Sequence, residues 1–431
     1  MGDQEVLSSN DIEFLKAISI KFTNDILCDV LKNYAETDNV QLKGINLGAN
    51  NFKKGDSYLS TLNRFTVIGT VKDSSGDRVI EAPVVVKSIP KNIARRKTFR
   101  SNEFFETEIN FYTKVWSRLL QFQKEKNIVV CNSVPRCLAA VCDGENDILV
   151  LQDISPENFK ALGRECRIDL EHCLLVIRMF ASFHAVSFAF KDQHPDEYEK
   201  IAVHLKETYY AERYRNWYGT FLKNLLVVWI DALEKEVPGS IYEKKFKDLI
   251  ANDLYGQFIN LVEDKGKYAV VSEGDTWLPN FMFQYIDNKP KAVCLVDFQL
   301  ARNSSFVLDL SFYIFACVDP SIRREHWDTI LTEYHKTFTS GLEKLGSNPG
   351  LLTYNDLKNE FVKYGKFGLA MCLEAAPFSV LPDEETADLD AMEGDEVVDI
   401  ASVWIVNKIP HQKGRMVLVD IVKDQVDLGF I

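Results

Sequence analysis

Residues 270–301 read VVSEGDTWLPNFMFQYIDNKPKAVCLVDFQLA, and this stretch determines how the rest of the chain is interpreted. Asn280 follows Asp275 by five positions, and Asp297 ends the apolar run AVCLVD. Two strand-like runs lie between Asn280 and Asp297, so the stretch predicts a loop, a hairpin and a second loop. Asp and Asn are ordinary turn residues, and it is their combination with the downstream Asp-Phe that makes the pattern specific.

The combination matches the chemistry of phosphoryl transfer. One carboxylate accepts the proton of the attacking hydroxyl, while an amide oxygen and a second carboxylate hold Mg²⁺ across the phosphates of a nucleotide. The order Asp-x4-Asn, hairpin, apolar strand and Asp-Phe is that of a kinase catalytic loop. We therefore interpret Asp275 as the catalytic base, and Asn280 and Asp297 as the metal ligands.

A kinase also needs a cation on the α and β phosphates and a carboxylate that positions it. Lys87 interrupts APVVVKSIP, a run that is apolar on both faces, where an unpaired ammonium would be costly to bury. In the next helix candidate Glu108 shares one face with Phe104, Phe111 and Val115, by the spacing i, i+4, i+7 and i+11. The pattern predicts a Lys87–Glu108 pair, against the alternatives of a surface-reaching strand lysine and a helix-surface acid.

The segment 48–65, GANNFKKGDSYLSTLNRF, precedes the first strong strand pattern. In a kinase this position covers the phosphates with backbone N–H groups, and Gly55, Asp56 and Ser57 are the candidate turn. The segment lacks GxGxxG, so the interpretation depends on its position.

The secondary-structure signal changes character near residue 150. Before it, β-branched runs at 62–71 and 78–89 flank a Ser/Gly/Asp turn and predict a hairpin. A helix is expected next at 99–122, and one more strand at 147–152. After it, helical periodicity prevails apart from the strand-like stretch 269–300, with helices expected at 169–190, 207–236 and 241–263. We therefore predict an α+β, protein-kinase-like two-lobe fold. Residues 1–150 form the small β-rich N-terminal lobe and 151–431 the larger, mainly helical C-terminal lobe.

Charge and composition narrow the function classes. The 431 residues carry 50 basic and 63 acidic side chains, so the net charge of −13 argues against binding to nucleic acid or to an anionic membrane. Nine cysteines without a CxxC pair, and an N-terminus without a basic and apolar leader, predict a soluble cytoplasmic protein. The acidic segment 383–399 is interpreted as a solvated loop, with a docking segment or a lid as alternatives.

Several longer motifs carry a family resemblance, namely KGDSYLS, VVVKSIP, FETEINFY, LVLQDISPENF, AxFHAVSF around His184, GDTWLPNFMF and LVDFQLARNSSFVLDLSF. With these motifs the chain resembles the ecdysteroid kinase-like (CHK kinase-like) family, which is similar in fold to choline kinases and aminoglycoside phosphotransferases. The resemblance runs from about residue 40 to the C-terminus.

The resemblance implies ATP and Mg²⁺ as cofactors and a lipophilic alcohol, such as an ecdysteroid or a xenobiotic metabolite, as the substrate. It implies that Asp275 is the base, that Asn280 and Asp297 hold Mg²⁺, and that Asp309 braces the loop. It also implies a hinge that meets adenine, formed by Leu151, Gln152 and Asp153.

One departure keeps the alternatives open. The family normally reads HGD where this chain has Glu273-Gly274-Asp275, and an added carboxylate near two others raises a pKa or recruits a cation. A choline- or aminoglycoside-type kinase is one alternative, and a pseudokinase that binds without transfer is another. The short span from Asp297 to Asp309 leaves little room for a peptide platform, which favours a small-molecule acceptor.

Overall fold

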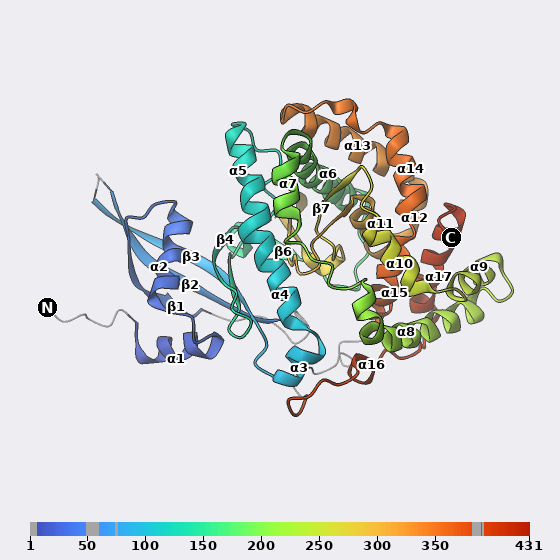
Figure 1. Ribbon diagram of the computed structural model, residues 1–431, viewed down its shortest axis with the longest axis horizontal. Coiled ribbons are helices and arrows are strands. Elements are labelled where there is room, and N and C mark those ends of the chain that lie inside the picture. The colour runs from blue at the N-terminus through green and yellow to red at the C-terminus, as the bar shows by residue number, and fades with distance from the viewer. Residues whose placement is uncertain (1–6, 49–59, 74–75, 382–388, 390–391) are drawn as a thin grey trace. The chain divides into compact units, whose positions relative to one another are not determined.

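The computed structural model describes residues 7–48, 60–73, 76–381, 389 and 392–431, and these form two compact units (Figure 1). The first unit contains the described residues up to 113, together with 134–158, 389 and 392–398. The second contains 114–133, the described residues from 159 to 381, and 399–431. The chain is α+β, with a β-rich first unit and a mainly helical second unit, as the sequence predicts.

The units are built from more chain segments than a single boundary after residue 150 implies. Residues 114–133 pack with the helical unit, where the Phe122 and Phe190 rings lie 5.3 Å apart. Part of the acidic segment packs with the β-rich unit, where the Val398 N–H donates to the Thr98 hydroxyl at 3.1 Å. These contacts join residues far apart in sequence, which local patterns do not reveal.

The first unit contains a five-stranded antiparallel sheet in the order β1-β2-β3-β5-β4. Its central hairpin is the predicted one, and it pairs from Thr61↔Ser88 to Asp73↔Gly76. The strands are β1 Val40–Asn46, β2 Thr61–Asp73, β3 Gly76–Ser88, β4 Cys137–Val141 and β5 Ile148–Gln152.

Helix α2 (Asn24–Ala35) packs against this sheet and forms the core of the first unit with it. Leu27, Val30 and Leu31 of α2 are fully buried, as are the β3 residues Ala82, Val84 and Val86 in the same core. The helix approaches so closely that a Cβ on Gly69 would lie 2.5 Å from the Leu31 Cδ1 and 2.9 Å from the Gln41 carbonyl. Only glycine therefore fits there. Helix α1 (Ser9–Ile18) begins with a capping box at Ser8.

The helix predicted at 99–122 is interrupted by a change of winding. It consists of α4 (Ser101–Asn110), a π-helical turn η1 (Phe111–Trp116) and α5 (Ser117–Glu125), and the short α3 (Ile93–Thr98) precedes it. Phe104, Glu108, Phe111 and Val115 are all buried, as their spacing predicts.

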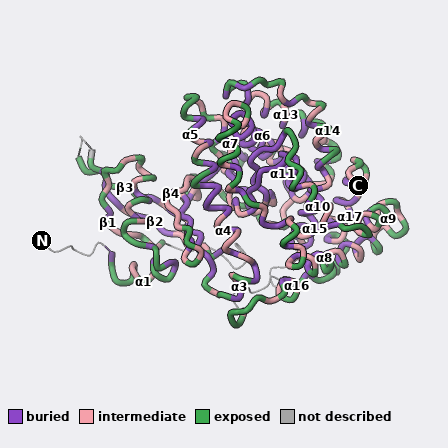
Figure 2. The backbone as a smooth tube through the Cα atoms, in the orientation of Figure 1, coloured by how far each residue is buried: buried purple, intermediate pink, exposed green. Residues whose placement is uncertain are grey.

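Two apolar helices, the long α6 (Leu170–Gln193) and the shorter α11 (Val307–Cys317), form the centre of the second unit. Helix α6 packs on α13 (Trp327–Lys344), and α11 packs on α15 (Phe367–Val380). Figure 2 shows α6 and α11 as mostly buried. Helix α6 is long and apolar enough by composition to cross a membrane, but 78% of its apolar window is buried inside the protein.

Two small sheets lie beside these helices. One has the order β6-β8-β9, and the other pairs β10 with β7. Their strands are β6 Phe159–Ala161, β7 Ala269–Ser272, β8 Phe281–Ile286, β9 Lys289–Leu295 and β10 Arg302–Ser305. The loop that joins β7 to β8 contains Asp275, and the loop that joins β9 to β10 contains Asp297.

The remaining helices surround this centre. They are α7 Pro195–Ala202, α8 Arg215–Glu236, α9 Ile241–Ile250, α10 Leu254–Glu263, α12 Pro320–Glu325, α14 Tyr354–Tyr364, α16 Ile400–Val403 and α17 Gln412–Asp427, with short 3-10 turns η3 Glu212–Tyr214, η4 Leu278–Asn280 and η5 Pro349–Leu351. Another 3-10 turn, η2 Ser155–Glu157, belongs to the first unit. The helix expected at 207–236 begins only at Arg215. The N–H groups of Tyr209 and Tyr210 instead donate to the Glu207 carboxylate, at 2.8 and 2.7 Å, which replaces helical hydrogen bonding.

Candidate active site

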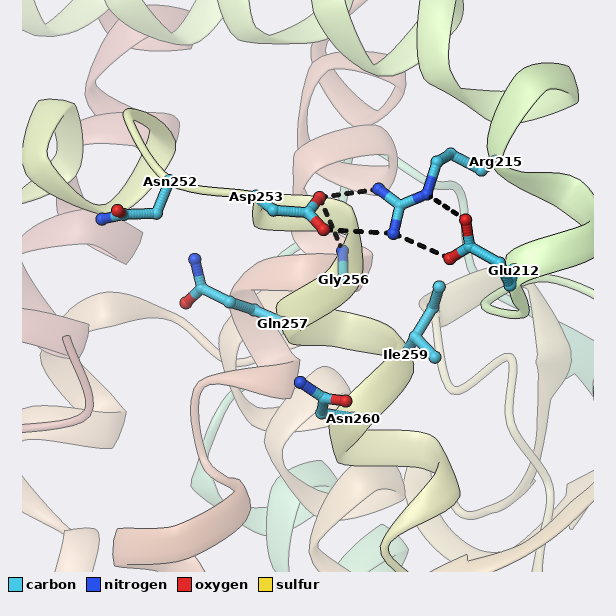
Figure 3. Close-up of a pocket in the computed structure, with 8 residues that line it drawn as sticks. All are labelled: Glu212, Arg215, Asn252, Asp253, Gly256, Gln257, Ile259 and Asn260. Carbon is cyan, nitrogen blue, oxygen red and sulfur yellow. Dashed lines mark hydrogen bonds and ion pairs between the residues drawn. The ribbon is translucent and has the colours of Figure 1, made fainter.

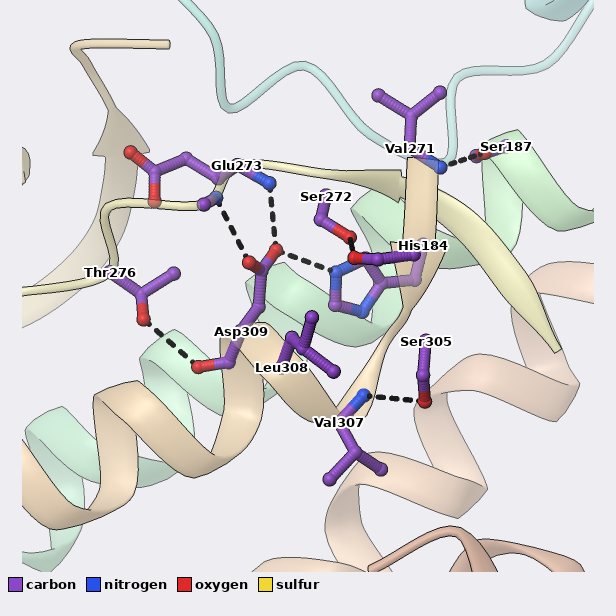
Figure 4. Close-up of polar contacts among 12 residues, drawn as sticks. His184, Ser187, Val271, Ser272, Glu273, Thr276, Ser305, Val307, Leu308 and Asp309 are labelled. Carbon is purple, nitrogen blue, oxygen red and sulfur yellow. Dashed lines mark hydrogen bonds and ion pairs between the residues drawn. The ribbon is translucent and has the colours of Figure 1, made fainter. Parts of the chain in front are cut away.

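The loop after β7 is held by one buried carboxylate. Asp309, in the first turn of α11, accepts the N–H of Glu273 at 2.7 Å and that of Gly274 at 2.9 Å (Figure 4). Gly274 has a φ of +90°, and a Cβ there would lie 2.0 Å from the Leu300 carbonyl oxygen. The loop can therefore take this path only with glycine at 274.

Asp309 is itself oriented by a buried histidine. The His184 Nε2 lies 3.1 Å from the Asp309 Oδ2, and its Nδ1 lies 3.0 Å from the Tyr334 hydroxyl. The Thr276 hydroxyl donates to the Asp309 carbonyl at 2.9 Å. Asp309 thus holds the loop after β7 from α11, and it contacts the loop through backbone groups that do not depend on the side chain at 273.

Asp275 and Asn280 are brought together as their spacing predicts. The Asn280 Nδ2 donates to the Asp275 carbonyl at 2.9 Å and to the Asp275 Oδ2 at 3.1 Å. The Gln299 Nε2 lies 3.4 Å from the same Oδ2. Among the described residues, none donates to the Asp275 Oδ1 or to the Asn280 Oδ1, so each side chain keeps one oxygen for another partner.

Asp297 lies just beyond β9 in a left-handed conformation, with a φ of +70°. This conformation is uncommon outside glycine, although Asp and Asn tolerate it, and it is found at functional sites. The preceding Val296 N–H donates to the Asn280 carbonyl at 3.1 Å, which links the two loops. The carboxylates of Asp275 and Asp297 are both half-buried.

The carboxyl groups of this site influence one another. Burial, followed by the charge of Asp297, raises the pKa of Asp275 to about 7. Burial, with the charges of Asp275, Asp309 and Asp297, raises the pKa of Glu273 well above its usual value. The neighbouring carboxylates thus disfavour the ionised forms of Asp275 and Glu273, an effect that a bound divalent cation would oppose.

The residue set fits Mg²⁺ in particular. This ion prefers oxygen ligands and is commonly held by one or two carboxylates together with the phosphates of a substrate. Asp297 and Asn280 provide one carboxylate and one amide oxygen. No group of three or more His, Cys, Asp or Glu side chains with metal-binding geometry occurs among the described residues.

The first unit contains the other predicted pair. The Lys87 Nζ lies 2.6 Å from the Glu108 Oε2, and the two residues are 6% and 2% exposed. Lys87 is fixed in β3 between Leu62 of β2 and Leu149 of β5, while Glu108 comes from α4. The structure therefore brings these two residues together as the sequence predicts, and neither surface alternative applies.

The predicted hinge follows directly from β5. The Gln152 N–H donates to the Arg136 carbonyl and the Asp153 N–H to the Pro83 carbonyl, both at 2.9 Å. The Asp153 Oδ2 pairs with the Arg64 Nε at 2.9 Å. An adenine contact at Leu151, Gln152 or Asp153 would therefore use backbone groups other than the N–H groups of Gln152 and Asp153. The phosphate-turn candidates Gly55, Asp56 and Ser57 lie outside the described residues.

The family model for the ecdysteroid kinase-like family matches residues 54–347 of the chain. The protein belongs to the ecdysteroid kinase-like family. The recognition from its motifs is thereby confirmed, and with it the kinase-like fold class and the assignment to small-molecule kinases. No curated protein matches the sequence.

Solved structures resemble this family member at low identity. An ethanolamine kinase of Plasmodium vivax is 14% identical and has a TM-score of 0.41, with 100% of this chain and 98% of that chain covered. The GDP complex of an aminoglycoside 2'-phosphotransferase is 11% identical with a TM-score of 0.36, covering 80% and 96%. A putative fructosamine-3-kinase of Haemophilus somnus is 12% identical with a TM-score of 0.27, covering 80% and 96%.

One acidic side chain of this kinase-family chain escaped the sequence analysis. Glu374 lies in α15, where it is the only charged residue, and it accepts hydrogen bonds from the hydroxyls of Tyr209 and Tyr218, the latter at 3.2 Å. Its charge contributes to the raised pKa of Asp275. The available signal was a single acid in the apolar run FGLAMCLEAAPFSV.

A surface hollow elsewhere in the second unit contains none of the predicted site residues. It lies between α8 and α10, and Arg215 there pairs with the carboxylates of Glu212 and Asp253, each at 2.7 Å (Figure 3). Because these groups satisfy one another, the hollow offers no unpaired charge for a ligand.

Proposed function

We propose that this protein is an ATP- and Mg²⁺-dependent kinase that phosphorylates a hydroxyl group of a small lipophilic alcohol, such as an ecdysteroid or a xenobiotic metabolite. The observation that carries the proposal is the Asp275 Oδ1, to which no described residue donates, on a carboxylate whose other oxygen accepts from Asn280 and whose pKa is raised by the charge of Asp297. A proton acceptor next to two oxygen ligands for a hard cation is what phosphoryl transfer to an alcohol requires.

Each residue has a stated task in this reaction. Asp275 accepts the proton of the acceptor hydroxyl, and Asn280, which donates to its other oxygen, fixes the direction of the carboxylate. Mg²⁺ held by Asn280 and Asp297 would neutralise charge on the nucleotide phosphates. In the first unit, Glu108 orients the Lys87 ammonium, which binds the α and β phosphates.

The loop geometry supports transfer over a binding-only role. The pseudokinase alternative depends on Glu273 in place of the family histidine. Yet the backbone at 273 and 274 is held by Asp309, so the loop keeps its brace without that histidine. The Glu273 Oε2 also accepts the Asp275 N–H at 2.9 Å, which fixes the backbone that carries the proposed base.

The cellular setting is part of the proposal. Cysteine usage supports a cytoplasmic enzyme, and the net charge of −13 supports a protein that binds neither nucleic acid nor an anionic membrane. A choline- or aminoglycoside-type acceptor is the alternative substrate class, favoured by the acidic side chains near Asp275.

The test is ATP turnover on a panel of ecdysteroids, glycosides, phenols and choline, with each product identified by mass. We expect a phosphorylated neutral alcohol, in a reaction that requires Mg²⁺ and is slowed about 100-fold or more in Asp275→Asn. The matched control is Glu360→Gln, which changes a half-buried acid of α14 that pairs with Ser305. Turnover on choline alone would show that the acceptor is of the choline type and not a neutral alcohol. No turnover on any alcohol would contradict the proposal.

A further inference from the structure

Residues 392–398 of the acidic segment, which we call the strap, lie along the short helix α3 in the first unit. The strap uses its backbone for the hydrogen bonds that hold it there. These run from the Asn92 Nδ2 to the Met392 carbonyl at 2.7 Å, from the Lys97 Nζ to the Asp395 carbonyl at 2.8 Å, and from the Val398 N–H to the Thr98 hydroxyl at 3.1 Å. Because Asn92 is the N-cap of α3 and Thr98 its last residue, the strap follows the whole helix.

The charges of the strap and the helix are complementary. Helix α3 contains three consecutive basic residues, Arg95, Arg96 and Lys97. The strap carries Glu393, Asp395 and Glu396, and the side chains of all three are exposed. Opposite charges on neighbouring segments attract over roughly 10 Å at physiological salt. The attraction adds to the backbone contacts without burying any of the three carboxylates.

Helix α3 is fixed to the start of the central hairpin. Arg95 is 4% exposed, and its Nη2 donates to the Ser60 carbonyl at 3.3 Å. Ser60 directly precedes β2, whose first residue, Thr61, pairs with Ser88 of β3. Lys87 is the neighbour of Ser88 in the same strand. A shift of α3 would therefore act on the end of the hairpin that carries Lys87.

Helix α3 is also joined to the helix that carries Glu108. The two helices meet at a tight corner, where Thr98 and Phe99 are 0% and 1% exposed. Arg100, the N-cap of α4, has a φ of +52°, and its guanidinium lies over the Phe104 ring at 5.2 Å. A left-handed residue other than glycine persists only where its surroundings hold it. The corner thus transmits the position of α3 to α4 and to Glu108.

The strap ends at a residue that is held independently of α3. Val398 is followed directly by Asp399 and by α16, which belongs to the second unit. There Ile400 is 1% exposed, and the Trp404 ring stacks on Phe221 at 5.5 Å. A segment tethered in this way binds its docking surface at a high effective concentration. A few backbone hydrogen bonds are therefore enough to keep the strap on α3.

We propose that the strap is a positioning element of the nucleotide site. Docked on α3, it holds the α3–α4 corner so that Glu108 keeps the Lys87 ammonium directed at the nucleotide phosphates, and its release weakens nucleotide binding. The effect on nucleotide rests on the proposed kinase function. The docking of the strap and the order of α4 are measured without it.

The experiment removes the contacts from the strap side and from the helix side. Val398→Pro deletes the N–H that reaches Thr98 and leaves α3 unchanged, whereas its control Val398→Ala keeps that N–H. Lys97→Met deletes the ammonium that reaches the Asp395 carbonyl, whereas its control Lys97→Arg keeps a cation. The double variant Lys97→Met with Val398→Pro combines the two losses. Lys97→Met alone serves as the test if Val398→Pro does not fold.

Three measurements are made on the full chain. Amide hydrogen exchange without nucleotide follows residues 393–397 of the strap and 101–110 of α4. Calorimetry gives the Kd for Mg·ATP, and steady-state kinetics gives the KM for the acceptor. A merely structural loss would change all of these together, whereas a positioning role changes exchange in α4 and the Kd for Mg·ATP and leaves the KM for the acceptor unchanged.

We expect the double variant to exchange about tenfold faster in the strap, the effect of losing one to two hydrogen bonds, and faster than the parent in α4 as well. Its Kd for Mg·ATP should rise about three- to tenfold, and both controls should behave as the parent. Faster exchange in the strap with unchanged α4 exchange and unchanged Kd would overturn the inference. Unchanged exchange in the strap would also overturn it. If the parent binds no nucleotide, the proposed function fails, and exchange in α4 alone decides the inference.

Discussion

The Lys87–Glu108 pair of the first unit and the acidic loops of the second unit differ in how their charges are balanced. In the pair, a cation and an anion lie 2.6 Å apart and compensate each other in a buried setting. In the loops, burial and like charges raise the pKa values of Glu273 and Asp275. The comparison teaches that the charges of the pair are balanced as the chain folds, whereas the acidic loops would be stabilised by a bound cation.

The largest effect is expected from removing the base. Asp275→Asn should lower kcat by 10²- to 10⁴-fold, the contribution of general-base catalysis, and leave nucleotide affinity nearly unchanged. The amide keeps the size of the side chain and the contact with Asn280. Steady-state kinetics with nucleotide binding by calorimetry provides the measurement, and Glu360→Gln is the control. A loss of nucleotide binding that parallels the loss of rate would assign Asp275 to the metal instead.

Breaking the compensated pair should cost stability as well as activity. Lys87→Met leaves the Glu108 charge buried without its partner, and such changes destabilise by about 3–5 kcal/mol. The double variant Lys87→Met with Glu108→Leu should regain much of this stability but none of the activity. Chemical denaturation measures the first and ATP turnover the second. The control is Asp29→Asn, at an exposed pair with Lys32 that should contribute under about 1 kcal/mol. A double variant as unstable as the single one would contradict the pairing argument.

Removing one charge from the loops tests their need for a cation. Asp297→Asn keeps a residue type that tolerates the left-handed backbone, so the fold should persist. The expected result is a loss of about tenfold or more in the Mg²⁺-dependent part of ATP binding, followed as thermal stabilisation with and without Mg²⁺. If the parent protein is stabilised equally by ATP in both conditions, Asp297 is not the metal ligand.

The smallest effects are expected at Glu273. Because the loop is braced through backbone groups, Glu273→His should change kcat by less than about tenfold, and a larger rise would indicate an active site held in a damped state.

Folding keeps the proton on Glu273 at pH values where the unfolded chain has lost it, so stability falls as the pH rises above about 4.5. Glu273→Gln removes this loss, and its gain in Tm over the parent should be larger at pH 8 than at pH 5. Equal gains at both values would contradict the raised pKa.

How well the sequence predicts each part of the site depends on how far apart in the sequence the contacting residues lie. Lys87 is predicted because a base interrupts an apolar strand pattern, and Glu108 because an acid lies on an apolar helix face. Asp275 and Asn280 were found because their five-residue spacing determines their contact. The hairpin of β2 and β3 follows from local turn chemistry in the same way.

The features that were missed depend on distant partners. Glu374 and Tyr209 meet across 165 residues, and no local pattern specifies that contact. Residues 207–214 have helical composition, yet the Glu207 side chain takes the N–H groups that a helix would use. The placement of residues 392–398 with the β-rich unit likewise depends on contacts with residues about 300 positions earlier, such as that of Val398 with Thr98.

The proline inside α15 has an evolutionary consequence. The indole of Trp229 donates to the Leu373 carbonyl, to which Pro377 has no N–H to donate, so the two side chains depend on each other. Replacing the indole alone strands a buried carbonyl, and replacing the proline alone makes the indole compete with a restored helical N–H. Relatives of this chain are therefore expected to exchange both residues together or neither, and a lineage that crosses between the two states passes through a destabilised intermediate.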